Sequence, residues 1–223
     1  MNSAGLNTPG YDNALGRLVR LVINAHTGVP NTRALLVGIS GIDASGKSFV
    51  SAKLANALRS NLLNVALISA DDWLNLPEVC INPENPAEHF YEHALRLDEM
   101  FTRLVVPLRN QRSVDVLADC GDARATVHRK HCYNFRNIDV VLLEGIFLFK
   151  SGCCGHFDLK IWIECSFKTA LERAIGRGQE GLSRTETIKS FQTIYFPAQR
   201  IHLDRDDPRA AVDYVFQNDE LRR

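Results

Sequence analysis

The stretch GIDASGKS at residues 41–48 decides the fold of this chain. It fits the spacing G-x-x-x-x-G-K-[ST] without a mismatch. An almost wholly apolar run at 34–39 precedes it, and apolar residues recur at helical spacing from Lys47 to about Arg59. A strand, a glycine-containing loop and a helix in this order are the context in which the pattern binds phosphate groups.

The chemistry of phosphate binding explains these residue types. Gly41 and Gly46 let the backbone wrap around an anion and point successive N–H groups inward. The helix that follows presents its positive end to the same anion. Lys47 would place a point charge between the β- and γ-phosphates, and the Ser48 hydroxyl is the expected Mg²⁺ ligand. The residues predicted to bind the nucleotide are Gly41, Ile42, Asp43, Ala44, Ser45, Gly46, Lys47, Ser48 and Phe49.

Further apolar runs alternate with helical patterns along the chain. Strands are expected at 65–69, 138–143, 159–163 and 212–216, and helices at 12–25, 87–104, 168–175 and 184–199. Strands separated by helices predict an α/β fold, with a mostly parallel sheet between two helical layers as in P-loop NTPases. The least readable segment, 109–137, is expected to hold a short hairpin or irregular strands.

Length and composition narrow the function classes. The 223 residues suit one domain over 1–223, with an N-terminal helical extension at 1–32 and a core at 33–219. The chain has 26 basic and 26 acidic residues, so it lacks the excess of positive charge that nucleic-acid binding needs. Its apolar runs are too short to cross a membrane, and residues 1–30 carry no signal-peptide pattern. We therefore expect a cytoplasmic protein that binds neither nucleic acid nor membrane.

Carboxylates follow two of the predicted strands. Asp71 and Asp72 come directly after the strand at 65–69, and Glu144 ends the run Val140–Leu143. Ligands of open α/β sheets lie beyond the carboxyl ends of the strands, so one of the two aspartates should face the γ-phosphate. A carboxylate there can accept a proton from an attacking hydroxyl and help to hold Mg²⁺. Glu144 has the position of a Walker-B acid, whose buried charge magnesium or its water shell would balance.

Two arginines suggest a mobile cover for the site. Arg173 and Arg177 are four residues apart, so they share one side of the predicted helix. The glycine-rich run 176–181 follows them. Basic residues beside a flexible segment suit a lid, expected at about 173–190, that closes over the phosphates and excludes water.

Taken together, these segments resemble the uridine kinase and phosphoribulokinase group, which also includes type I pantothenate and nicotinamide riboside kinases. The motifs that carry the resemblance lie within residues 33–219, and the segment I-D-V-V-L-L-E-G-I is similar to uridine/cytidine kinases in particular. They are GIDASGKS (41–48), SADDW (69–73), NPAEHFY (85–91), IDVVLLEGIF (138–147), YFPAQ (195–199) and the final VDYVFQND.

The resemblance implies Mg²⁺- and ATP-dependent transfer of a γ-phosphoryl group to a primary hydroxyl of a small molecule. It implies that Asp71, two residues before Trp73, is the catalytic base, with Asp72 as the second choice. Ser48, Asp71 and Glu144 would hold Mg²⁺. Lys47 would act on the phosphates, and Arg173 and Arg177 would be lid arginines. Family members are often oligomeric, which leaves a homo-oligomer open.

Two departures concern the lid and the acceptor. Gly178 follows Arg177, where uridine kinases typically have an aspartate. Uridine kinases also contact the pyrimidine through a Tyr and a His, and Val114 and Asp119 occupy those positions here. A nucleoside is the favoured acceptor, and nicotinamide riboside, pantothenate or a sugar phosphate are alternatives. A nucleotide-dependent switch without an acceptor is the rival from another class.

Overall fold

A five-stranded sheet forms the centre of the computed structural model, which describes residues 9–121, 126–178 and 181–219. The strand order is β2-β5-β1-β6-β7, and every neighbouring pair is parallel. Every residue of β1 and β5 is buried, which explains their almost continuous apolar sequences. The predicted parallel α/β sheet is confirmed. The strands are β1 (Leu35–Gly41), β2 (Val65–Ser69), β5 (Val140–Glu144), β6 (Leu159–Glu164) and β7 (Tyr214–Gln217).

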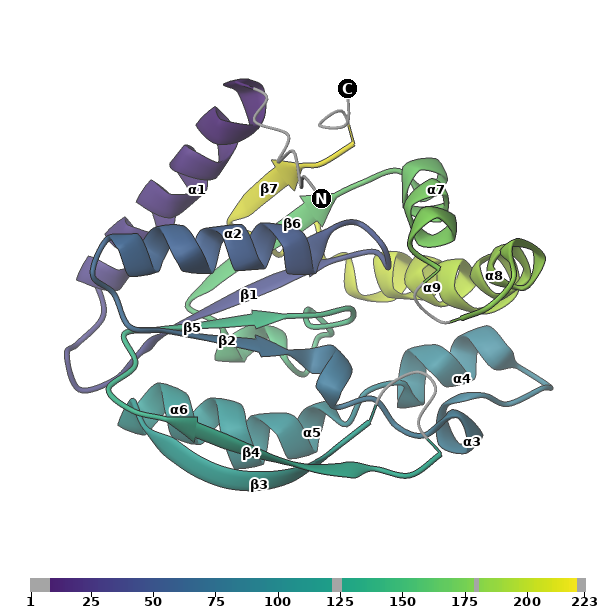
Figure 1. Ribbon diagram of the computed structural model, residues 1–223, viewed down its shortest axis with the longest axis horizontal. Coiled ribbons are helices and arrows are strands. Elements are labelled where there is room, and N and C mark those ends of the chain that lie inside the picture. Colours follow the sequence, from purple (N-terminus) through teal and green to yellow (C-terminus); the bar gives the residue numbers. More distant parts are fainter. Residues whose placement is uncertain (1–8, 122–125, 179–180, 220–223) are drawn as a thin grey trace, which may run out of the picture.

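Helices cover both faces of this sheet (Figure 1). On one face lie α1 (Pro9–Thr27) and α2 (Lys47–Ser60), whose apolar sides share one buried cluster with the strands. On the other face lie α5 (Leu97–Met100), α6 (Val106–Gln111) and α9 (Phe196–Asp206), which share a second buried cluster. The two clusters on either side of the sheet give the three layers that the sequence predicts.

The prediction of one continuous helix at 87–104 is wrong. The chain leaves helical geometry after α4 (Pro86–His93), which a short helix, α3 (Pro77–Cys80), precedes. Between α4 and α5, Leu95 forms an isolated antiparallel bridge with Leu74. Pairing with a distant segment therefore overrides local helix propensity at this point.

Two helices contain a five-residue π-helical turn, at Phe101–Val105 and at Phe191–Tyr195. Each turn ends two residues before a proline, Pro107 or Pro197. Proline lacks the N–H that an α-helix needs in its interior, and a wider turn accommodates its ring. The second turn joins α8 (Arg184–Ser190) to α9, so the helix predicted at 184–199 extends to the end of α9.

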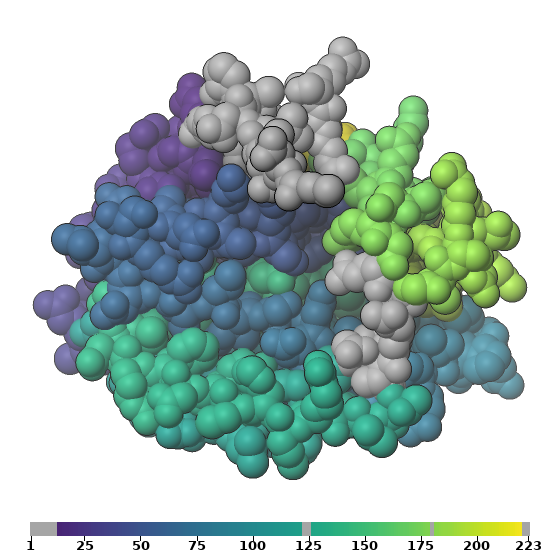
Figure 2. All heavy atoms as spheres, in the orientation of Figure 1, coloured from purple at the N-terminus to yellow at the C-terminus, as the bar shows by residue number. Residues whose placement is uncertain are grey.

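The unreadable segment 109–137 contains a separate two-stranded antiparallel sheet. Its strands are β3 (Val114–Cys120) and β4 (Arg129–Phe135). This hairpin forms the lower surface of the molecule in Figure 2, together with neighbouring residues of similar colour. It packs outside the main sheet and contributes Ala118 and Tyr133 to the buried cluster on that side.

A buried carboxylate joins three separate segments on the same side of the sheet. Asp206, at the end of α9, accepts hydrogen bonds from the Tyr91 hydroxyl of α4 at 2.6 Å and from the Ser151 hydroxyl at 2.9 Å. His202 Nδ1 lies 2.7 Å from the same carboxylate. These bonds fix α4 and the segment after β5 to α9.

Parts of three predicted regions lie outside the described residues: 1–8 of the N-terminal extension, 122–125 of the segment 109–137, and 179–180 of the lid. The described part of the extension is mainly α1. The described part of the lid is the end of α7 (Phe167–Arg177) together with α8. Over the residues that can be described, none of the helices combines the length and apolar character needed to cross a membrane.

Candidate active site

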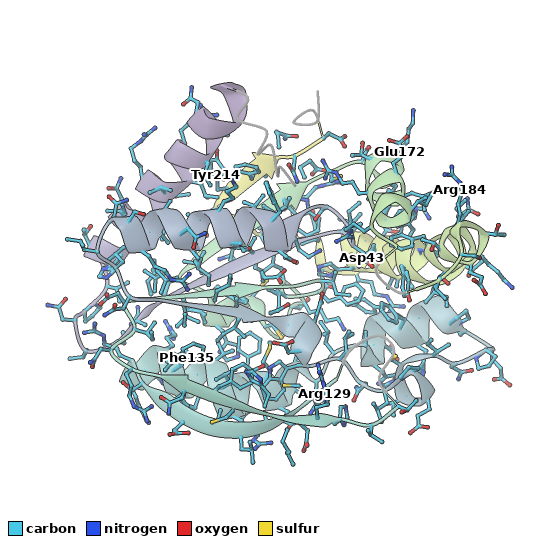
Figure 3. All side chains as sticks on the ribbon, in the orientation of Figure 1. Asp43, Arg129, Phe135, Glu172, Arg184 and Tyr214 are labelled. Atoms are coloured by element: carbon cyan, nitrogen blue, oxygen red, sulfur yellow. The ribbon has the colours of Figure 1, made fainter. Side chains whose placement is uncertain are left out.

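The polar residues singled out by the sequence gather at one end of the main sheet. Figure 1 shows the loop between β1 and α2, the turn after β2, and helices α4, α7 and α8 at this end. In Figure 3, Asp43 and Arg129 lie toward this end, whereas Phe135 lies at the opposite end of the hairpin. These are the carboxyl ends of parallel strands, where open α/β sheets bind their ligands.

The phosphate loop has the backbone that its glycines predict. Gly46 has a φ of +95°, and a Cβ atom there would lie 2.5 Å from Asn218 Nδ2. A Cβ atom on Gly41 would lie 2.6 Å from the Ile163 carbonyl oxygen. Ala44 also has a positive φ, of 57°. The loop is therefore wound tightly against β6 and the segment after β7, and neither glycine can gain a side chain without displacing backbone or a buried amide.

Lys47 lies across this loop. Only 7% of the residue is exposed, and its ammonium donates a hydrogen bond of 2.8 Å to the Ile42 carbonyl. A buried ammonium held by a loop carbonyl is positioned to exchange that partner for a phosphate oxygen. Phe49, the last residue of the predicted binding set, is 58% exposed on the first turn of α2, with Lys53 Nζ 5.6 Å from its ring centroid.

Glu144 connects the phosphate loop to the turn after β2. It is 4% exposed, and its Oε1 accepts hydrogen bonds from the Ser48 hydroxyl at 3.1 Å and the Ser69 hydroxyl at 2.7 Å. Its Oε2 atom is buried and has no hydrogen-bond partner among the described residues. A buried carboxylate oxygen without a partner is costly unless a cation or an ordered water is bound there.

These oxygens fit a magnesium ion that is shared with phosphate. Mg²⁺ prefers hard oxygen ligands, and it is usually held by one or two carboxylates, substrate phosphates and water. Ser48 and Glu144 supply a hydroxyl and a carboxylate side by side. The described residues contain no group of three or more His, Cys, Asp or Glu that would hold a metal alone.

Asp71 has an unusual charge environment. It lies in a short 3₁₀ turn, and its backbone N–H donates to the Ser69 hydroxyl at 3.3 Å. The residue is exposed, but the protein atoms around its carboxyl displace water from it. This desolvation, followed by the charge of Glu144, raises the pKa of the carboxyl to about 7. Lys47 opposes this rise, and Asp43 adds to it. Asp71 therefore shares one electrostatic environment with the phosphate loop and Glu144.

Asp72 points to a different partner. Its Oδ2 accepts a hydrogen bond of 3.3 Å from the hydroxyl of Tyr133 on β4. Its backbone carbonyl accepts a hydrogen bond of 3.0 Å from the N–H of Gly121. The two neighbouring aspartates are thus separated, with Asp71 beside the nucleotide-binding residues and Asp72 beside the hairpin.

The two predicted lid arginines occupy different environments. Arg173 is only 5% exposed and donates to the Ser45 carbonyl at 2.9 Å and to the Asn218 carbonyl. In this structure the Arg173 guanidinium therefore bonds the phosphate loop to the segment after β7, and its role as a lid arginine stays a prediction. Arg177 is exposed at the end of α7, where Gly178 turns the chain with a φ of +54°. Arg177 keeps the position of a candidate lid arginine.

Asn218 and Tyr133 were not among the predicted site residues. Asn218 is 6% exposed, and its side-chain amide donates to the Ser45 carbonyl at 2.6 Å. Its position directly after β7, at the carboxyl edge of the parallel sheet, is the signal that would have found it. Tyr133 carries no comparable signal, because its contact with Asp72 depends on how the hairpin packs.

The positions that correspond to pyrimidine contacts lie far apart. Val114 begins β3 and pairs with Phe135, whereas Asp119 lies near the other end of the strand. Five residues of extended strand span roughly 17 Å, so these two short side chains do not both reach one small ring. The carboxylate of Asp119 forms an ion pair of 2.7 Å with Lys130.

Comparison with characterised sequences finds similarity to uridine kinases. No family model matches the chain. It is 26% identical over 156 residues to a uridine kinase of Saccharomyces cerevisiae, a match that covers 66% of this chain and 30% of that enzyme. It is 23% identical over 167 residues to a uridine kinase of Limosilactobacillus reuteri, covering 74% of this chain and 73% of that enzyme. The match thus spans less than a third of the yeast enzyme.

Solved structures share the fold. A protein described as a possible uridine kinase from Bacillus stearothermophilus superposes with a TM-score of 0.73 at 19% identity, covering 93% of this chain and 99% of its own. Phosphoribulokinase from Rhodobacter spheroides superposes with a TM-score of 0.57 at 14% identity, covering 84% and 71%. By sequence the chain is similar to uridine kinases, and its fold is similar to that of these P-loop kinase structures.

Proposed function

We propose that this chain is an ATP- and Mg²⁺-dependent kinase that transfers the γ-phosphoryl group to a primary hydroxyl of a small molecule, most plainly a nucleoside such as uridine or cytidine. The observation that carries the proposal is the position of Asp71 beside Glu144 and the phosphate loop, with the pKa of its carboxyl raised to about 7. A general base works best when its pKa lies near the working pH. Phosphoryl transfer to an alcohol needs such a group next to the γ-phosphate.

Each residue then has a defined task. Lys47 and the loop N–H groups hold the β- and γ-phosphates, and Asp71 accepts the proton of the acceptor hydroxyl. Ser48 and Glu144, with Asp71 nearby, would hold Mg²⁺, which neutralises charge on the phosphate oxygens when it is bound. Arg177 is the exposed cation that can approach from α7. The protein mainly positions groups and balances charge, because this reaction needs little covalent help.

A different hydroxyl acceptor is the second candidate, and one observation favours it. Val114 and Asp119 are too far apart to contact one pyrimidine ring, and Asp119 is already paired with Lys130. Recognition of another compound, such as nicotinamide riboside, pantothenate or a sugar phosphate, would leave the phosphoryl-transfer residues unchanged.

The test is ADP formation from Mg-ATP with a panel of acceptors: uridine, cytidine, other nucleosides, nicotinamide riboside, pantothenate and ribulose 5-phosphate. We expect stimulation by uridine or cytidine. Stimulation by another compound alone keeps the mechanism and replaces the acceptor. ADP formation that no acceptor increases would contradict the kinase proposal and favour a nucleotide-dependent switch. For the variant Asp71→Asn, the matched control is Asp204→Asn, which removes a negative charge from an exposed position on α9.

A further inference from the structure

The turn after β2 is fastened to the hairpin by contacts on both sides of Asp72. The Gly121 N–H donates to the Asp72 carbonyl, and a short parallel bridge joins Gly121 to Trp73. A Cβ atom on Gly121 would lie 2.8 Å from the Leu74 carbonyl oxygen, so the two backbones approach as closely as a glycine allows. The chain thus brings the turn that carries Asp71 into direct contact with the end of β3.

Side chains strengthen this junction. Trp73 is fully buried and stacks on Tyr133, with ring centroids 6.1 Å apart. The Arg96 guanidinium lies 5.3 Å from the Trp73 ring centroid. The backbone N–H of Arg96 donates to the Trp73 carbonyl at 3.0 Å. Three segments that are distant in the sequence therefore meet around Trp73.

The polar contact within this junction is the bond between Tyr133 and Asp72. Tyr133 is 5% exposed, and its hydroxyl lies 3.3 Å from Asp72 Oδ2 and 3.5 Å from Cys120 Sγ. Burial, together with the nearby Cys120 and Asp72, raises the pKa of the Tyr133 phenol well above its ordinary value. The phenol therefore stays protonated at neutral pH and remains a donor to the carboxylate.

We propose that Tyr133 and Asp72 form a positioning pair that sets the distance between the base Asp71 and the acceptor hydroxyl. The inference rests on the proposed kinase function. The bond directs the Asp72 carboxylate to the hairpin, whereas the neighbouring Asp71 lies in the electrostatic environment of Glu144 and Lys47. Both are proposed as positioning residues, because Asp72 bonds to Tyr133 and the buried Tyr133 side chain packs on Trp73. Loss of the bond should therefore misplace the acceptor and leave ATP binding unchanged.

The test is a double-mutant cycle of Tyr133→Phe and Asp72→Ala, which leaves no acceptor at position 72. Each single change should lower kcat/KM for the acceptor by about 5- to 20-fold, with the KM for ATP within about twofold of the wild type. The double variant should lose little more than either single variant, because both remove the same bond. Three results would contradict the proposed pair: additive losses of acceptor kcat/KM in the double variant, an equal loss of ATP affinity, or no loss of acceptor kcat/KM in the single variants.

A matched control lies on the opposite side of the same two strands. Cys132 is exposed, and its Sγ lies 3.7 Å from the carboxylate of Asp115. Cys132→Ser should leave both kinetic constants unchanged. If it reduces acceptor kcat/KM as much as Tyr133→Phe does, the effect belongs to the hairpin as a whole and the specific pair is refuted.

A second readout separates this inference from the proposed function. Hydrogen–deuterium exchange, measured without substrates, should become faster at the amides of residues 72–74 and Gly121 in Tyr133→Phe and stay unchanged in Cys132→Ser. Unchanged exchange in Tyr133→Phe refutes the pair. If the wild type phosphorylates no acceptor, the proposed function fails, and the exchange data still decide whether the pair holds the turn.

Discussion

The nucleotide side of the candidate site, residues 41–48 with Glu144, is built differently from the proposed acceptor side, which is the junction of residues 72–74, Arg96 and the hairpin. On the nucleotide side most groups belong to one short motif, and they are buried and bonded to one another. The proposed acceptor side is assembled from segments that are distant along the chain, such as Asp72 with Tyr133 and Trp73 with Arg96. Residues of one short motif can be recognised in a sequence, whereas contacts between distant segments cannot. The reaction type of such a chain is therefore easier to predict than the acceptor.

Asp71→Asn should separate the two sides most sharply. Loss of the base should lower turnover about 10²- to 10⁴-fold, whereas ATP should still bind because the phosphate loop is intact. Acceptor-dependent ADP formation measures the first quantity, and calorimetric titration with ATP measures the second. Near-normal turnover in Asp71→Asn, with Asp204→Asn as the reference, would remove Asp71 from the base role.

Lys47→Ala should damage the nucleotide side. The ammonium is buried in the loop, where it would contact phosphate oxygens, so ATP affinity should fall about 10- to 100-fold. Calorimetry with Mg-ATP gives the dissociation constant directly. Lys168→Ala, which removes an exposed lysine from the first turn of α7, should change nothing. Unchanged affinity in Lys47→Ala would contradict the assigned role of the loop.

The titration of Asp71 tests whether this residue belongs to the nucleotide side. In the protein without metal or nucleotide, its carboxyl should titrate near pH 7, and Asp43→Asn should lower that pKa because it removes one nearby negative charge. Mg-ATP should also lower it if the metal lies close to the carboxylate. Carboxyl ¹³C NMR follows both shifts. A pKa of about 4 in the free protein would contradict the described environment.

His202 provides the smallest of the expected effects, and it concerns stability. Burial lowers the pKa of its imidazole in the folded chain. The unfolded chain therefore binds this proton more readily, so the free energy of unfolding should fall as the pH drops through about 6.5, by at most about 1.4 kcal/mol per pH unit. The carboxylate of Asp206, whose pKa is also lowered, loses its contribution only at much lower pH.

Urea unfolding between pH 7 and pH 5.5 measures this dependence. His202→Asn should flatten it, whereas replacement of the exposed His93 by glutamine should not. An equal pH dependence in the wild type and His202→Asn would show that other groups cause it. His93 is a suitable control because it lies on α4, which packs against α9, the helix that carries His202.

How much the sequence predicts follows the same division. The phosphate loop, the strands β1 and β5 and the acid at Glu144 are local patterns, and each was predicted within a few residues. The interruption at Leu95 and the burial of Arg173 depend on contacts with distant segments, so periodicity alone misses them. The spacing of Arg173 and Arg177 correctly predicts that both lie on one helix. It does not predict which of the two side chains is buried.

The π-helical turn at Phe191–Tyr195 has a consequence for how this chain can vary. One extra residue in a helical turn rotates everything that follows by about 100° about the helix axis. The side of α9 that lies in the core, with Ala198 and His202, is therefore set by the number of residues before it. Removal of one residue from this turn would rotate that side away from the sheet. The segment should thus tolerate exchanges of residue type better than a change in length.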